Sequence, residues 1–205
     1  RLEHGAAADE AWVRSQLGAL LRAARRMAAT VEEITDAAQL QMGQHLTLNV
    51  DTVDVGEMVQ AVASLVRAAA PVEVDTHSGV TMEGDRLRLE RVMQNIIGNA
   101  VKYNLRDAPI HVDVEQREQS VVITVRDRGV GIPADELPHI FTHFYRATTS
   151  IGIKGTGVGL AGSKSIVEQH GGHISVQSAL GQGTTVVITL PTSFHDAQSK
   201  DISRR

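Results

Sequence analysis

The hydrophobic positions in the first part of the chain recur at alternating spacings of three and four residues. This stripe extends over about three heptads and consists of Leu17, Leu20, Ala24, Met27, Val31, Ile34 and Ala38. The pattern predicts one long helix over residues 9 to about 42. Such a stripe could pack on the helix's own domain, but its length favours a helical hairpin or a dimeric bundle.

A shorter helix is predicted after a polar stretch that contains Gly43 and Asn49. Asp54 and Glu57 are three residues apart at its start, as in a capping box. Its apolar positions share one helical face and are expected to be buried: Val55, Met58, Val59, Val62, Leu65 and Val66. The polar stretch predicts a domain boundary near residue 50.

After Pro71 the apolar positions change from helical spacing to alternation, which is typical of strands. The predicted strands are residues 72–76, 80–82, 110–114, 121–125, 173–176 and 185–190. Helices are predicted at 85–104 and 160–170, and a glycine pair ends the second one. Helices kept apart from an antiparallel or mixed sheet favour an α+β sandwich.

The helix predicted at 85–104 has a polar stripe opposite its apolar face. Asp85 is its expected N-cap. Residues three and four apart are neighbours on a helix, which places four polar side chains in one stripe: Arg91, Asn95, Asn99 and Lys102. Asparagine is unfavourable inside helices, so these amides indicate a role other than helix stability. Taken alone, however, such a stripe is more often a solvated helix face.

Three glycine-bearing segments follow this helix. Residues 127–133 begin with Asp127, whose carboxylate can accept a hydrogen bond from an exocyclic amine. Residues 154–160 open a helix, and the successive N–H groups of such a turn attract phosphate oxygens. Residues 181–185 connect two strands. Any one of these segments alone is more often a simple turn.

Composition narrows the possible functions. The 205 residues are 42% hydrophobic, which is enough for a substantial core, and the formal net charge of -4 does not indicate a nucleic-acid-binding surface. The absence of cysteine excludes disulfides and thiolate metal sites and fits a reducing compartment. No apolar run approaches the roughly 18–20 residues that a membrane span needs. Since the chain begins with Arg1 and without a signal peptide, we expect a piece of a longer protein.

Two further groups of side chains are expected to be structural. His170 and His173 lie on either side of the predicted helix end, so a turn is a simpler interpretation than a pair of metal ligands. Phe141 and Phe144 are expected to be core residues or anchors of a lid rather than stacking partners of a ligand.

Five ordered segments together resemble the sensor histidine kinases. Residues 95–103 resemble the N box of that family, 127–131 the G1 box, 140–146 the F box and 155–160 the G2 box, and 181–185 match its last glycine turn. The resemblance covers residues 54–191. It implies a Bergerat-type α/β sandwich, in which helices cover one face of a mixed, mainly antiparallel sheet, preceded by a long helix of a dimerisation bundle.

The resemblance also implies a domain organisation. Residues 1–50 would be part of the dimerisation and phosphotransfer hairpin, 51–191 the catalytic ATP-binding domain and 192–205 a flexible tail. The acceptor-histidine box of the family is missing, and His4 lacks its acidic and proline neighbours. We therefore expect the phosphorylated histidine to lie outside this chain.

By the same resemblance, ATP would lie between the N-box helix and a lid over residues 147–154. Asp127 would bond the adenine amine, and Asn99 would hold Mg²⁺ with the phosphates, with Asn95 as a second candidate ligand. Lys102 and Tyr103 would face the phosphates or the sugar, and Arg146 the γ-phosphate. The expected catalytic residues are Asn95, Lys102 and Arg146. The remaining expected ATP-binding residues are Gly129, Gly131, Ile132, Lys154, Gly155, Thr156, Gly157, Val158, Gly159, Leu160 and Thr185.

Position 95 separates the alternatives for function. ATP-hydrolysing relatives of the gyrase, Hsp90 and MutL types typically have a water-activating glutamate at this place, whereas Asn95 cannot accept a proton at neutral pH. Phosphoryl transfer to a histidine is therefore favoured over an ATPase clamp. Gly162 stands where the family usually has a branched apolar residue. With the missing acceptor box, it supports the alternative of a degenerate nucleotide-binding regulatory module without turnover.

The expected cofactors are ATP and Mg²⁺. The resemblance implies a response-regulator receiver domain as partner and a homodimer through the helical hairpin, and no nucleic acid. We expect a cytoplasmic fragment, with any membrane attachment provided by parts of the protein outside it.

Overall fold

The computed structural model describes the greater part of the segment that carries the five family-like motifs. The described residues are 16, 17, 20, 35, 47–67, 70–77, 79–104, 108–153 and 155–194. The helix predicted over 9–42 therefore lies outside the described residues, apart from four residues that are helical: Gln16, Leu17, Leu20 and Thr35. Residues 195–205 of the predicted tail also lie outside them.

A five-stranded sheet forms one layer of the molecule, in the spatial order β2-β4-β5-β7-β6. Its strands are β2 (Val72–Thr76), β4 (Ile110–Arg117), β5 (Ser120–Arg126), β6 (His173–Ala179) and β7 (Gly183–Pro191). Only the β2–β4 pair is parallel, and the other three pairs are antiparallel. A separate two-stranded ribbon pairs β1 (Asp51–Asp54) with β3 (Thr81–Gly84).

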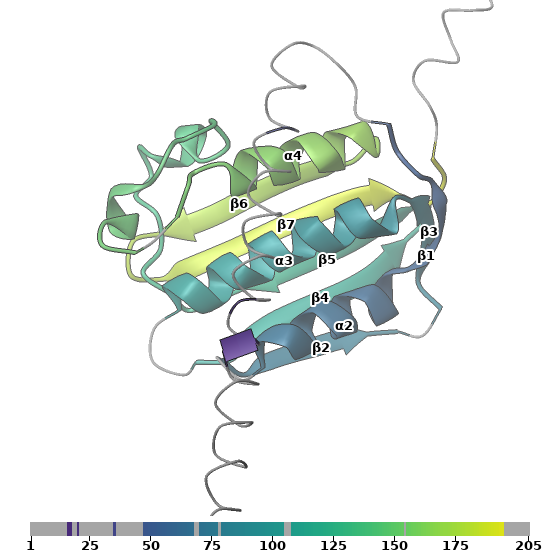
Figure 1. Ribbon diagram of the computed structural model, residues 1–205, viewed down its shortest axis with the longest axis horizontal. Coiled ribbons are helices and arrows are strands. Elements are labelled where there is room, and N and C mark those ends of the chain that lie inside the picture. The colour runs from purple at the N-terminus through teal and green to yellow at the C-terminus, as the bar shows by residue number, and fades with distance from the viewer. Residues whose placement is uncertain are drawn as a thin grey trace, which may run out of the picture.

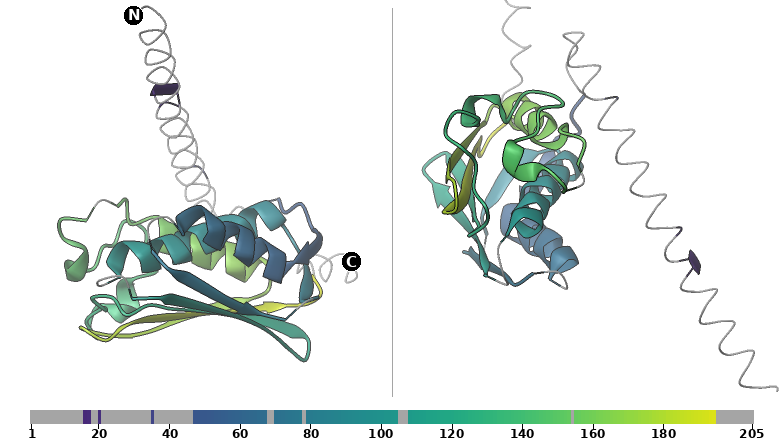
Figure 2. Two further views of the ribbon diagram at one scale, coloured as in Figure 1. Left: turned by 90° about the horizontal axis from the view of Figure 1, so that it is seen from below. Right: turned by 90° about the vertical axis from the view of Figure 1, so that its left-hand side faces the viewer.

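Three helices form the second layer and cover one face of the sheet (Figure 1 and Figure 2). They are α2 (Val55–Val66), α3 (Arg86–Tyr103) and α4 (Gly159–Gln169). Two short 3-10 helices, η1 (Leu137–His139) and η2 (Thr148–Ser150), interrupt the long connection between β5 and α4. This arrangement confirms the predicted mixed, mainly antiparallel sheet with helices on one face.

The predicted N-caps of two helices are confirmed. The Asp54 carboxylate accepts a hydrogen bond of 2.9 Å from the Glu57 backbone N–H at the start of α2. The Asp85 carboxylate accepts one of 3.1 Å from the Arg88 N–H at the start of α3. Each bond satisfies one of the N–H groups that a helix leaves free in its first turn.

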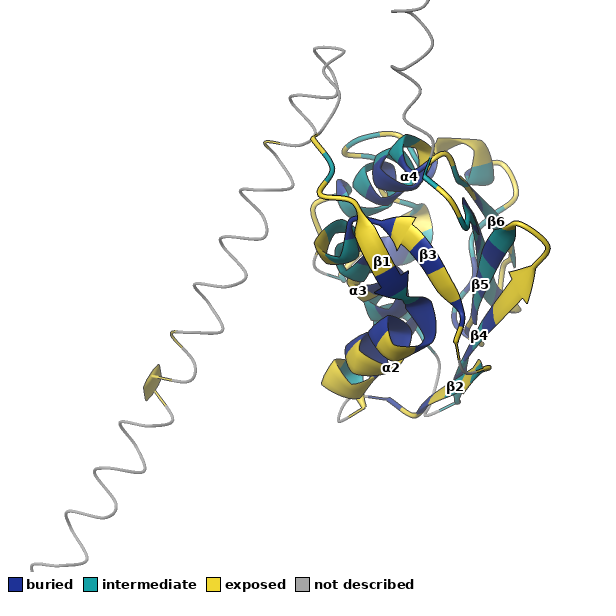
Figure 3. Cartoon of the chain, turned by 90° about the vertical axis from the view of Figure 1, so that its right-hand side faces the viewer, coloured by how far each residue is buried: buried dark blue, intermediate teal, exposed yellow. Residues whose placement is uncertain are grey.

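The core lies between the helices and the sheet, and Figure 3 shows α2 turning its buried residues inward. The largest fully buried apolar side chains are Met58, Leu89, Met93, Ile96, Ile97, Ile110, Ile123, Ile188 and Leu190. The prediction of a buried Leu65 is wrong, since this side chain is 71% exposed. At 100° per residue Leu65 falls just outside the arc of α2 that faces the sheet, and Ala63 is buried instead.

The strand β1 was not predicted, because a strand of four residues with one fully buried side chain, Val53, carries too little alternation. The start of the predicted tail contacts this part of the fold. The Glu83 backbone N–H donates to the Thr192 carbonyl at 2.9 Å, and the Phe194 N–H donates to the Glu83 carboxylate at 2.9 Å. Residues 192–194 are therefore fixed against β3.

His170 links the end of α4 to the start of α3. Its ring is 1% exposed, its Nε2 accepts the Asp85 backbone N–H at 3.0 Å, and its Nδ1 lies 2.7 Å from the Ile166 carbonyl oxygen. Since Nε2 accepts, Nδ1 is the nitrogen that carries the proton, and the ring is neutral. Burial lowers the pKa of His170, which favours that neutral form. The structural interpretation of His170 is supported, and the described residues contain no cluster of acidic or histidine side chains suited to a metal.

Candidate functional site

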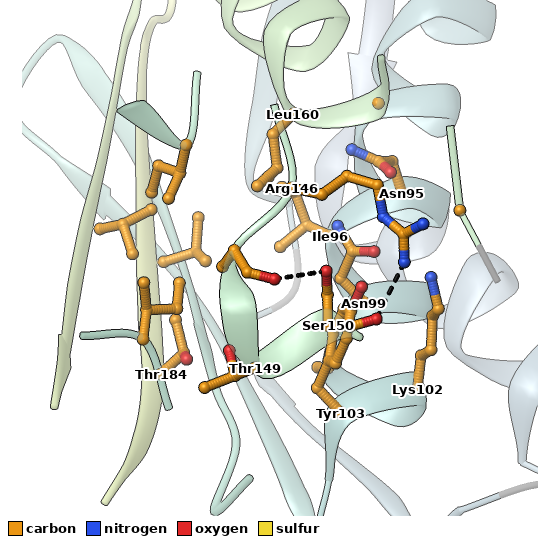
Figure 4. A pocket seen from close by; sticks show the side chains of 18 of the residues that line it. Asn95, Ile96, Asn99, Lys102, Tyr103, Arg146, Thr149, Ser150, Leu160 and Thr184 are labelled. Carbon is orange, nitrogen blue, oxygen red and sulfur yellow. Dashed lines mark hydrogen bonds between the residues drawn. The ribbon is translucent and has the colours of Figure 1, made fainter. Parts of the chain in front are cut away.

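A cavity lies between α3, the start of α4 and the η2 segment (Figure 4). Thirteen of the residues that the sequence predicts for ATP binding line it: Asn95, Asn99, Lys102, Tyr103, Asp127, Gly131, Ile132, Arg146, Gly155, Thr156, Gly157, Gly159 and Leu160. The fold therefore brings the N-box helix and the glycine segments together, although Asn95 and Leu160 are 65 positions apart in the sequence.

The α3 wall of the cavity carries polar side chains of the predicted stripe next to the apolar Ile96 and Ala100. Asn95, Asn99 and Lys102 line the cavity, whereas Arg91, one turn earlier in the same stripe, does not. The Asn95 side-chain Nδ2 donates to Ser163 Oγ of α4 at 2.9 Å. The Lys102 ammonium lies 4.9 Å from the centroid of the Tyr103 ring. These contacts hold the polar side chains at the cavity wall, so the stripe is not a freely solvated helix face.

Asp127 lies directly after β5 at the base of the cavity and is 8% exposed. Its Oδ1 accepts backbone N–H bonds from Gly129 at 2.7 Å and from Thr184 at 3.2 Å. Burial raises the pKa of the Asp127 carboxyl, and these two hydrogen bonds act in the opposite direction. The two hydrogen bonds thus offset only part of the free-energy cost of burying the ionised Asp127 carboxylate.

Three predicted residues do not line the cavity, and one cannot be placed. Gly129 packs against the end of α3, where an added Cβ would lie 2.3 Å from the Tyr103 carbonyl oxygen. Val158 and Thr185 are also absent from the lining, and Lys154 lies outside the described residues. Gly129 therefore shapes the backbone beneath the cavity rather than its surface.

Thr184 of β7 lines the cavity, whereas the predicted Thr185 does not. The alternation of β7 could have identified it, because Thr184 shares the strand face of Val186 and Ile188, which are buried. Thr185 is on the opposite face of the same strand. Its neighbour across the strand pair is Arg126, which is exposed.

The lid side of the cavity is held by two charged side chains. The Glu136 carboxylate accepts the Thr148 backbone N–H at 2.9 Å and the Thr148 hydroxyl at 2.5 Å. These hydrogen bonds lower the pKa of Glu136. The Arg146 guanidinium donates through Nη2 to the Ser150 carbonyl at 2.9 Å and also to the Ile153 carbonyl. Glu136 and Arg146 together fold residues 146–153 over the cavity.

The two phenylalanines of the F-box segment differ in their surroundings. Phe141 is partly buried and packs against the core. Phe144 is 65% exposed, and its backbone N–H donates to the Gly157 carbonyl at 2.8 Å. Phe144 therefore anchors the lid through its backbone, while its ring faces solvent.

Thr184, which lines the cavity, and two residues that hold its walls, Ser163 and Glu136, are among those not predicted from the sequence. Ser163 is 3% exposed on α4 and bonds Asn95 across the helix interface. Glu136 follows the G1-like segment and acts on a residue twelve positions later. Neither contact has a local sequence signal, because each joins separate elements of the fold.

The sequence pattern of the family described as "Histidine kinase-, DNA gyrase B-, and HSP90-like ATPase" matches residues 84–193. Among curated relatives, the signal transduction histidine-protein kinase AfsQ2 of Streptomyces coelicolor is 34% identical over 168 residues, which cover 82% of this chain and 31% of AfsQ2. The chain thus spans about a third of the length of that relative.

Solved structures agree with this similarity. A mycobacterial sensor histidine kinase, MprB, matches 71% of this chain and 99% of its own, at 28% identity and a TM-score of 0.62. Full-length ShkA in complex with AMPPNP matches 90% of this chain and 40% of its own, at 26% identity and a TM-score of 0.71. No described helix is long and apolar enough to cross a membrane. From its fold, its cavity and these similarities, the chain belongs to the histidine kinase-, DNA gyrase B- and HSP90-like ATPase family, and its ATP-binding domain is of the sensor histidine kinase type.

Proposed function

We propose that this chain is the catalytic region of a sensor histidine kinase, which transfers the γ-phosphoryl group of ATP to a histidine outside the chain. The observation that carries the proposal is the chemistry of position 95 at the cavity wall. Asn95 is an amide that cannot act as a base, and its nitrogen is bonded to Ser163. A site without a base for water favours transfer to another nucleophile over steady hydrolysis.

The cavity offers suitable partners to each part of ATP. Both backbone donors to Asp127 use Oδ1, which leaves Oδ2 for the adenine amine. Gly159 and Leu160 of the first turn of α4 line the cavity, and first-turn N–H groups, which have no partner within a helix, can bind phosphate oxygens. Lys102 lies at the same end, since an added Cβ at Gly155 would be 2.9 Å from its ammonium. The related ShkA structure contains the nucleotide AMPPNP.

Arg146 can serve the lid and the γ-phosphate at the same time. Its two bonds to the lid carbonyls both start from Nη2. A guanidinium has five N–H donors, so Nη1 and Nε are still available for a phosphate oxygen. In this proposal the binding of the γ-phosphate draws the lid down through Arg146.

The donor set of the cavity also fits Mg²⁺ bound together with the triphosphate. The wall presents the carboxamides of Asn95 and Asn99, and Mg²⁺ prefers oxygen ligands while it keeps several waters. Asn99 would hold the ion through its Oδ1, with Asn95 as the second candidate. The ion would supply neutralisation of phosphate charge, which together with positioning carries most of phosphoryl-transfer catalysis.

The proposal extends to partners by similarity to the relatives. The phosphohistidine would be relayed to the receiver domain of a response regulator, and the helix predicted over residues 9–42 would contribute to a homodimer. Because ATP is supplied inside the cell, this region would act in the cytoplasm.

Supplying an intact acceptor hairpin of a sensor histidine kinase in trans tests the proposal. With Mg²⁺ and γ-labelled ATP, we expect acid-labile phosphohistidine on the hairpin, and we expect Asn99→Ala to abolish it. Bound ATP without any labelled histidine would defeat the proposal. If nucleotide binding were also unchanged by Asn99→Ala, the chain would instead be a regulatory nucleotide-binding module.

A further inference from the structure

The Asn95 carboxamide is held by α4 at two positions one helical turn apart. Its Nδ2 donates to Ser163 Oγ at 2.9 Å. Gly159 lies against the same carboxamide, since an added Cβ there would be 2.3 Å from Asn95 Oδ1, 2.8 Å from Cγ and 3.0 Å from Nδ2. Gly159 therefore leaves the space that the amide occupies, and Ser163 provides the acceptor for its nitrogen.

Packing alone does not explain a hydroxyl at position 163. Ser163 is 3% exposed, and the other buried side chains of α4 are Ala161, Ile166 and Val167, none of which has a polar atom. Burying a hydroxyl costs free energy unless it is hydrogen-bonded. Ala161 shows that a small side chain without a hydroxyl fits the buried face of the same helix.

The bond to Ser163 determines which end of the amide is left for a ligand. A carboxamide has an acceptor oxygen at one end and a donor NH₂ group at the other. Nδ2 is bonded to Ser163, so Oδ1 is the end left for a ligand, and both Asn95 and Gly159 line the cavity. Only the oxygen end can bind a cation or accept from a water held by one.

We propose that Ser163 is a positioning residue that presents Asn95 Oδ1 to the magnesium-bound triphosphate. This inference rests on the proposed binding of Mg-ATP at the cavity, but not on phosphoryl transfer. Groups that orient the ligands of a metal typically change metal affinity by about 10- to 100-fold when they are removed. The effect of Ser163 should therefore appear only when Mg²⁺ is present.

The test compares the affinity of the full 205-residue chain for AMPPNP in Mg²⁺ and in EDTA, by calorimetry. Ser163→Ala should weaken binding by about 10-fold in Mg²⁺ and leave it unchanged in EDTA, and Ser163→Thr, which retains the hydroxyl, should restore it. Ser165→Ala is the matched control, because this hydroxyl bonds only the Ala161 carbonyl, at 3.1 Å, in the part of the chain that the structure describes. It should match the wild type under both conditions.

A second measurement needs neither nucleotide nor activity. In the ligand-free chain, the side-chain NH₂ signals of Asn95 in a ¹⁵N–¹H spectrum should shift in Ser163→Ala, and should stay in place in Ser165→Ala. Three results would each overturn the positioning role of Ser163. One is that the Asn95 signals stay in place in Ser163→Ala, and another is that Ser163→Ala loses the same affinity with and without Mg²⁺. The third is a wild-type affinity for AMPPNP that does not depend on Mg²⁺. Mg²⁺-dependent binding that relies on Ser163 but yields no phosphohistidine would support this role and defeat only the kinase proposal.

Discussion

The two walls of the nucleotide cavity are held in place by different forces. The α3 wall rests on a buried apolar face, which includes Met93, Ile96 and Ile97, each at most 1% exposed. The lid opposite has exposed apolar side chains, with Ile151 at 81%, and depends on the polar bonds of Glu136 and Arg146. Packing fixes the α3 side chains before a ligand arrives, whereas a few polar bonds can be exchanged when it does.

The two walls also differ in position, since α3 runs across the centre of the molecule and the connection that carries η2 projects from one end (Figure 1). Segments with few buried apolar contacts open at a lower free energy than the core. We therefore expect the amides of Asn95 and Asn99 to be preorganised and the lid to close when a nucleotide binds.

The largest effect should come from the same truncation made on each wall. Ile97→Ala removes a fully buried side chain of α3 and should lower the free energy of unfolding by about 2–5 kcal/mol. Ile151→Ala in the exposed lid should change it by less than about 0.5 kcal/mol. Denaturant titration measures both. Equal losses of unfolding free energy in the two variants would show that the lid unfolds together with the core, which would contradict the difference between the two walls.

The next largest effect, on ATP affinity, is expected at Asp127 at the base of the cavity. Asp127→Asn should weaken ATP binding by roughly 10- to 100-fold, because hydrogen bonds with a charged group contribute about 1.5–3 kcal/mol. The new NH₂ group would also face the donor amine of adenine. Calorimetry with ATP and with GTP checks this, and an unchanged preference for ATP would show that Asp127 does not contact the base.

The ionised Asp127 carboxyl is expected to favour ATP binding but to lower the stability of the folded chain. Since burial raises the pKa of Asp127, its ionised form destabilises the folded state at neutral pH. Asp127→Asn should therefore unfold at the same temperature as the wild type or at a higher one at pH 7. This advantage should disappear below about pH 4, where the carboxyl is protonated in both states. A less stable variant at pH 7 would contradict this assignment.

The buried His170, which links α4 to α3, predicts how the stability of the folded chain depends on pH. Burial lowers its pKa, while the charges of Asp85 and Arg88 act in opposite directions. As the pH falls through about 6.5, the unfolded chain binds the proton first, so stability is complete above this pH and declines below it. The decline can reach about 1.4 kcal/mol per pH unit.

Unfolding titrations between pH 7.5 and roughly pH 5 measure this slope. His170→Gln cannot take up the proton and should flatten it. His173→Gln changes an exposed histidine three residues away and serves as the control, with the wild-type slope. If His173→Gln flattened the slope and His170→Gln did not, the assignment of the slope to His170 would be wrong.

A smaller effect is expected from the lid itself. Glu136→Gln keeps one acceptor oxygen for Thr148 but removes the charge, so amide hydrogen exchange at Thr148 should accelerate, on the order of 5-fold. Asp135→Asn makes the same change at an exposed neighbour and should not alter the exchange. Exchange along α3 should stay as it is in both variants. Faster exchange in α3 would show that the two walls are not independent.

The contrast between the walls also describes what the sequence could predict. The α3 stripe, its Asp85 cap and the alternation of the main strands depend on residues close together in the chain, and the structure agrees with those predictions. Thirteen of the residues named from the family-like motifs line one cavity.

What sequence reasoning missed depends on contacts through space. The pairs Asn95–Ser163 and Glu136–Thr148 join different elements, and no spacing rule connects them. Thr184 lines the cavity and the predicted Thr185 does not, because consecutive residues of a strand point to opposite faces. The prediction of a buried Leu65 is wrong for a related reason, because the width of the buried arc of a helix is set by the sheet that it faces.

The smallest predicted effect lies at Gly162, near the junction between the lid and the fixed helices. This glycine is inside α4, and an added Cβ would meet no other atom within 4 Å, so neither space nor backbone conformation requires glycine there. Gly162→Ala should therefore stabilise the chain by about 0.5–1 kcal/mol through helix propensity alone. ATP affinity should not change, because Gly162 does not line the cavity. A thermal melt and a calorimetric titration on the same sample check both points, and tighter ATP binding would mean that the glycine loosens the glycine-rich turn before it.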